Sequence, residues 1–123
     1  MNKKLKPTLI LIILLTLRFT SFSQFEIDTN YQYSELDTIN GQIETAKRMK
    51  KYMDEKQYEK AISLFSVHQQ QKIKNIQKNE SDFANWCIAW TITDEKLPRF
   101  ISRIQRRKGY FVFEDKMWKI DEN

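Results

Sequence analysis

The segment that decides the fold runs from Ser81 to Ile120 and reads SDFANWCIAWTITDEKLPRFISRIQRRKGYFVFEDKMWKI. Its first ten residues carry the strongest apolar stripe in the chain. The stripe repeats at steps of three and four residues, as one face of a helix requires, and consists of Phe83, Trp86, Cys87 and Trp90. Ser81-Asp82 precedes the stripe and can cap that helix.

The middle of the segment predicts a further helix. Thr93 or Asp94 can cap it, and Pro98 is tolerated in its first turn, where backbone N–H groups have no helical partner. Gly109 follows the last turn, where we expect it to end the helix. The buried side of this helix is expected to consist of Leu97, Phe100, Ile101 and Ile104.

After Gly109 the apolar period changes from helical to two. The two alternating runs, Tyr110 to Phe113 and Met117 to Ile120, flank a polar turn and predict a β-hairpin. Since two strands alone are marginally stable, the hairpin must pack on the helices. The side chains expected to face the helices are Phe111, Phe113, Trp118 and Ile120.

Upstream, apolar residues at helical spacing predict a pair of helices within 41–65, and Ser66 with Gln69 has the spacing of a capping box that starts a third. We therefore predict an α+β, mostly α, fold: a bundle of four to five short helices closed by a C-terminal β-hairpin. The predicted globular domain covers 41–123. Residues 24–40 contain four acidic residues and no basic one, and are interpreted as a loosely ordered acidic arm.

Residues 1–23 resemble a signal peptide. Three lysines precede a short apolar run from Leu9 to Leu17, and Ser21 and Ser23 supply small residues before a cleavage site ahead of Gln24. The run is shorter than the roughly 20 apolar residues that a membrane-spanning helix needs, so no stable anchor is expected after cleavage. The sequence predicts a periplasmic or secreted protein.

Removing this leader changes the charge of the protein. The whole chain has 21 basic and 16 acidic residues, and four of the basic residues lie in the leader, which leaves 17 against 16. Proteins that bind nucleic acid usually carry a clear basic excess on the binding domain. We therefore expect no nucleic-acid partner.

The residue types that carry most catalysis are scarce. His68 and Cys87 are the only histidine and cysteine, and no Gly-rich phosphate loop is present. A closed zinc site needs four ligands at recognisable spacing, which this chain does not provide. Between two tryptophans on an apolar stripe, Cys87 is better explained as a small buried side chain than as a nucleophile. The sequence thus predicts no catalytic, cofactor or metal site.

Two groups of residues are candidates for binding. The first, called the basic face below, consists of Arg99, Arg103, Arg106 and Arg107; it serves either as a solvated face that compensates the helix dipole or as a docking surface for an acidic partner. The second group consists of Phe83, Trp86 and Trp90, which form either part of the core or the wall of a ligand pocket.

Two short stretches resemble known families. Tyr52 to Phe65 resembles the helix pair of a tetratricopeptide repeat, although a single copy cannot bury its own face. That helical segment, together with the terminal stretch Met117-Trp118-Lys119-Ile120, is similar to small exported NTF2-like proteins. The second resemblance implies an α+β cone that often binds small apolar ligands, which is the alternative fold.

The sequence favours an exported, non-catalytic interaction module, for example an immunity or inhibitor protein that uses the basic face. The alternative is a small-ligand pocket protein, or a degenerate enzyme of NTF2-like type, with Trp86 and Trp90 in the pocket wall.

Overall fold

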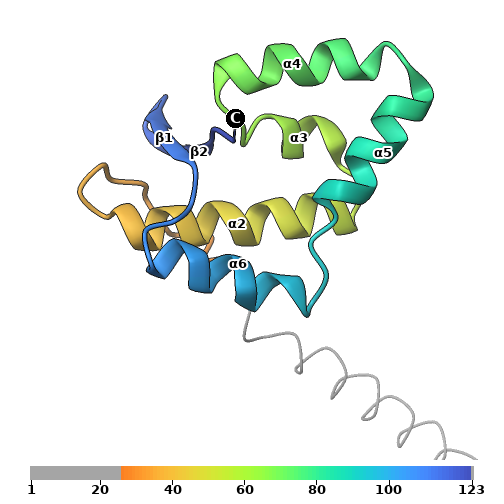
Figure 1. The fold of residues 1–123 in the computed structure, drawn as a ribbon. Helices are drawn as coiled ribbons and strands as arrows, with labels where there is room; N and C mark the ends of the chain where they lie inside the picture. The colour runs from red at the N-terminus through yellow and green to blue at the C-terminus, as the bar shows by residue number, and fades with distance from the viewer. Residues whose placement is uncertain (1–25, 123) are drawn as a thin grey trace, which may run out of the picture.

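The computed structural model describes residues 26–122, which form five helices followed by one antiparallel hairpin (Figure 1). This confirms the predicted helical bundle closed by a C-terminal hairpin. The predicted leader, residues 1–23, lies outside the described residues. No helix of residues 26–122 combines the length and apolar character needed to cross a membrane. In chain order the elements are α2 (Thr38–Asp54), α3 (Tyr58–Ile62), α4 (Val67–Gln77), α5 (Glu80–Trp90), α6 (Lys96–Gln105), β1 (Phe111–Glu114) and β2 (Met117–Ile120).

Helix α2 is the centre of the fold. It packs against α3, α6 and β2, and runs beside α6 in Figure 1. Ala46 and Met49 on its inner side are fully buried. The helix begins at Thr38, three residues before the boundary predicted at Gly41, because the backbone N–H of Gly41 already donates to the carbonyl of Asp37 at 2.9 Å.

Side-chain caps set the start of two helices. The Ser66 hydroxyl accepts from the backbone N–H of Gln69 at 3.2 Å, which confirms the predicted start of α4. Helix α5 begins earlier than predicted because Asn79, rather than Ser81 or Asp82, is its cap. The Asn79 side-chain oxygen accepts from the backbone N–H of Asp82 at 3.1 Å.

The predicted hairpin is present, with Phe111 opposite Ile120 and Phe113 opposite Trp118. Its first strand lies one residue later than the predicted run from Tyr110 to Phe113, because Glu114 pairs with Met117. Its two turn residues, Asp115 and Lys116, both have positive φ, as in the tight turns that match the twist of paired strands.

Strand β2 is held on both edges. Besides β1, it contacts the loop between α3 and α4, where Ile120 donates to the carbonyl of Leu64 and accepts from Ser66 N–H, both at 2.8 Å. Ile120 is 2% exposed, as predicted for a helix-facing side chain. Lys119 on the opposite face is also buried, and its Nζ donates to the Ser63 carbonyl at 2.5 Å. This additional pairing anchors the hairpin to the bundle.

The described part of the acidic arm, from residue 26 onward, is hydrogen-bonded to α2. The carboxylate of Glu44, a buried residue of α2, accepts from the backbone N–H of Asp28 at 3.0 Å, and Arg48 donates to the Asp28 carbonyl at 3.1 Å. Farther along, the carbonyl of Ser34 accepts from Trp118 Nε1 at 3.0 Å. These contacts join the arm to both α2 and the hairpin.

Candidate functional site

The basic face is built on α6. Glu95 is the N-cap residue of this helix and makes no side-chain cap hydrogen bond, so the predicted caps, Thr93 and Asp94, lie just before it. Thr93 still contacts the first turn: its hydroxyl accepts from the backbone N–H of Lys96 at 3.2 Å, and its carbonyl accepts from Leu97 N–H at 3.0 Å. Leu97 and Ile104 are 0% and 1% exposed and face the core. The spacing of three and four residues therefore puts Arg99, Arg103 and Arg106 together on the opposite side, where all three are exposed.

The last of the four predicted arginines lies beyond this helical face. Arg107 has a left-handed φ of 57°, its N–H donates to Ile104, and Lys108 N–H donates to Arg103, both at 2.9 Å. This pair of bonds is the Schellman arrangement that ends many helices. The prediction that Gly109 is the stop is wrong: Gly109 has no positive φ, and Arg107 takes the left-handed position.

Positive charge is concentrated in α6 and the residues that follow it. Residues 96–108 contain six basic residues and no acidic one, while the remaining described residues contain 11 basic and 16 acidic residues. The segment thus carries +6 and the rest of the described chain −5. The two charges nearly cancel, so the net charge of the described chain does not reveal that they lie in separate regions.

The guanidinium groups of the basic face remain available to a partner. The ion pairs of the described residues use Arg48 and Lys50, not the arginines of α6. Arg106 makes one side-chain hydrogen bond, from Nε to the carbonyl of Ser102 at 3.3 Å. Each planar guanidinium can therefore offer paired N–H donors to a carboxylate.

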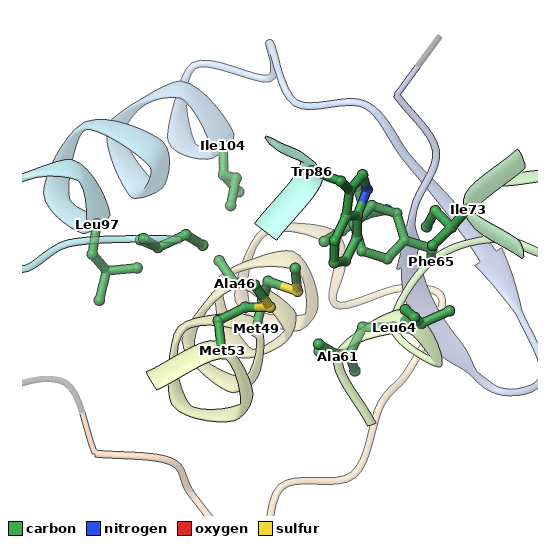
Figure 2. Close-up of a cluster of buried hydrophobic side chains, with 13 residues drawn as sticks. Ala46, Met49, Met53, Ala61, Leu64, Phe65, Ile73, Trp86, Leu97 and Ile104 are labelled. Carbon is green, nitrogen blue, oxygen red and sulfur yellow. The ribbon is translucent and has the colours of Figure 1, made fainter. Parts of the chain in front are cut away.

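The aromatic residues predicted as core or pocket wall are mainly core. Phe65, which is 2% exposed, has its ring centroid 4.9 Å from Trp90 and 5.8 Å from Trp86. Trp86 is 8% exposed and stacks on Phe83 with centroids 5.6 Å apart. Figure 2 shows Trp86 beside Phe65, above the α2 side chains Met49 and Met53. These rings fill the space between α5 and the loop before α4.

Two hollows adjoin the aromatic residues Phe83 and Trp90. Neither hollow is lined by both Trp86 and Trp90, as the predicted pocket would be. A cavity of about 30 Å³ lies beside Trp90, with Phe100, Phe111 and Arg103 among its lining residues. A shallow hollow of about 350 Å³ touches Phe83, but its other lining residues are mostly polar or charged, for example Lys56 and Glu59. The first volume is enough for a small group and far below that of a pocket for a drug-sized ligand.

A wider hollow of about 420 Å³ lies between the arm and α2. Lys50, one of its lining residues, is paired with Asp54 at 2.6 Å and Asp94 at 3.1 Å. Burial lowers the pKa of Lys50, but its hydrogen bonds to these two carboxylates outweigh burial and raise it overall. The Lys50 charge is therefore satisfied within the fold.

Cys87 and His68, the remaining candidates from the sequence, lie outside the basic face. Cys87 is half-buried, and burial raises the pKa of its thiol, which disfavours the nucleophilic thiolate. His68 is exposed in the first turn of α4, and no hydrogen bond joins it to Cys87 in the described part of the chain. Within residues 26–122 no cluster of three or more His, Cys, Asp or Glu side chains is suited to holding a metal.

Sequence reasoning missed two features of this region. The first is the meeting of Arg103 and Trp90 at one cavity, which depends on how α5 and α6 pack. The second is Tyr110, 56% exposed at the same cavity, which was assigned only to a strand. Comparison of the chain with family models, with curated proteins and with solved structures finds no match.

Proposed function

We propose that this protein is an exported, non-catalytic interaction module that docks an acidic surface of a partner protein through Arg99, Arg103 and Arg106. An immunity or inhibitor protein, which blocks its partner by covering it, is the concrete form of this proposal. The observation that carries it is the +6 charge of residues 96–108, presented by exposed arginines that make no ion pair within the described chain.

The separation of charge supports a protein partner with a local acidic patch. The basic segment attracts carboxylates, while the −5 of the remaining described residues repels an extended polyanion such as nucleic acid. A partner with one acidic patch gains the attraction without meeting most of the repulsion. Such charge complementarity speeds association and selects the partner.

The packing of α6 supports a surface role. Its apolar side is already used in the core by Leu97 and Ile104, so the arginines can be replaced without opening the fold. Dipole compensation requires cations near the last turn only, whereas Arg99 lies in the first half of the helix. The basic face therefore extends beyond what the helix needs for its own stability.

The test is capture of partners from a periplasmic extract on immobilised mature protein. The variant is Arg103→Ala/Arg106→Ala, and the matched control is Lys72→Ala/Lys74→Ala, which removes the same charge from two exposed positions of α4. Circular dichroism checks that each variant is folded. Nuclease treatment of the extract separates protein partners from nucleic acid.

The proposal predicts a protein that wild type and the α4 control retain, that the α6 variant loses, and that moderate salt releases. Capture that the folded α6 variant retains in full would contradict the proposal. Capture that disappears after nuclease treatment would replace the protein partner with nucleic acid.

A further inference from the structure

The cavity beside Trp90 is lined mainly by apolar side chains, together with one arginine and one glutamate. Its lining includes the buried side chains of Ile104 and Ile120. It also includes Phe100 and Phe111, whose ring centroids lie 6.2 Å apart in an edge-to-face arrangement. Arg103 from the basic face also lines this cavity. Tyr110, 56% exposed, is a further lining residue.

The size of the cavity decides what can enter it. A volume of about 30 Å³ has room for a small group only, whereas ligand pockets usually measure about 300–1,000 Å³. The tip of an aliphatic side chain fits this space and would be desolvated by the aromatic walls. A few fully desolvated contacts near the centre of a protein interface, surrounded by contacts that exclude water, often carry most of its affinity.

The charges around the cavity decide what must lie beside that side chain. Arg103 is within the lining, and Arg99 and Arg106 follow on the same helical side. One acidic residue, Glu122, also contributes to the lining, but it makes no ion pair with Arg103. The neighbours of the inserted side chain should therefore be carboxylates.

We propose that this cavity is the anchor point of the docking surface, and that it receives one aliphatic side chain from an acidic segment of the partner protein. The inference rests on the proposed function and adds the class of sequence recognised: a Leu or Val flanked by Asp or Glu. The aliphatic group supplies contact area at the cavity, and the carboxylates pair with the arginines around it.

An anionic membrane would use the same charges, but the geometry favours a protein segment. Helices that lie on membranes insert their apolar face among the lipids. Leu97 and Ile104 on the apolar face of α6 are buried in the core, and the apolar feature beside the basic face is a small cavity rather than a projecting surface. Only Tyr110 offers an exposed aromatic ring at this site.

The test uses short fluorescent peptides with the folded mature protein. The first peptide places Leu between runs of Glu, the second replaces that Leu by Ser, and the third replaces Glu by Gln. Anisotropy measures the affinity, and the indole N–H signal of Trp90 in a nitrogen-15 NMR spectrum locates the contact. Vesicles containing phosphatidylserine provide the membrane comparison.

We expect the Leu peptide to bind about tenfold more tightly than the Ser peptide, because its side chain leaves water at the cavity. The Leu peptide should also shift the Trp90 indole signal. Tyr110→Ala should reduce the preference for Leu, Arg103→Ala should weaken both acidic peptides, and Lys72→Ala should change neither.

Equal affinity for the Leu and Ser peptides, with an unshifted Trp90 signal, would overturn the anchor but leave docking by charge intact. Absence of binding to any acidic peptide would also overturn the anchor, and the capture experiment would then decide the proposed function alone. Vesicle binding that depends on Arg103 and exceeds peptide binding would replace the protein segment with a membrane surface.

Discussion

Replacement of Arg107 by Gly should stabilise the protein, although it removes a residue of the basic face. Arg107 has φ of 57° at the end of α6, a conformation that brings the Cβ of an L-residue close to the following carbonyl. Glycine has no Cβ and adopts this conformation without that strain. Comparing Arg107→Gly with Arg107→Ala isolates the effect of backbone conformation on stability, since both variants remove the same charge and the same hydrogen-bonding group.

The magnitude follows from two opposing terms. The left-handed conformation costs a non-glycine residue about 1–2 kcal/mol. The greater freedom of glycine in the unfolded chain offsets about 0.5–1 kcal/mol of that gain. Arg107→Gly should therefore be more stable than Arg107→Ala by about 0.5–1 kcal/mol in the free energy of unfolding.

Urea unfolding followed by circular dichroism measures this difference, and the neighbouring residue supplies the control. Arg106 has φ of −86°, so there Gly should be less stable than Ala, by about 0.5–1 kcal/mol. A difference in stability between Gly and Ala that has opposite signs at these adjacent positions is what a left-handed residue at the helix end predicts. If Gly is less stable than Ala at both positions, the left-handed turn at Arg107 is refuted.

Three further predictions concern other parts of the chain. Gly41→Ala should destabilise the fold by about 1–3 kcal/mol in urea unfolding, because the added Cβ overlaps the Trp118 indole; increased stability, as helix propensity alone predicts, would contradict this packing. Cys87 should react more slowly with a thiol reagent in the native protein at pH 8 than in the unfolded chain, because burial raises its pKa and limits access, and equal rates would argue against this. Mass spectrometry of the exported protein should find a chain that begins at Gln24, whereas an intact Met1 would contradict cleavage.

The helices and the hairpin were predictable because their signals are local. The stripe on α5 and the alternation after Gly109 each depend on residues that are neighbours in the sequence. Errors arose at element ends, where one hydrogen bond decides the boundary. Asn79, the cap of α5, precedes the predicted cap and was not recognised. The end of α6 was predicted at Gly109, but Arg107 takes the left-handed conformation that ends the helix.

Contacts between distant segments were not predictable from periodicity. The pairing of Ile120 with Leu64 and Ser66 involves a loop without an alternating pattern, and the arm is held by the buried carboxylate of Glu44. The candidate site likewise combines a feature that is local in the sequence with one that depends on packing. The spacing of the arginines placed three of them on one helical side, but the cavity shared by Arg103 and Trp90 arises only when the helices pack.

The most direct test of the docking surface is the affinity of the captured partner, measured at low and moderate salt with the mature protein. The wild type should bind more weakly as salt rises, and Arg103→Ala/Arg106→Ala should bind at least about tenfold more weakly than the wild type at low salt. The loss of two exposed charges should also reduce the dependence on salt. An affinity that neither salt nor the folded double variant changes would contradict the account.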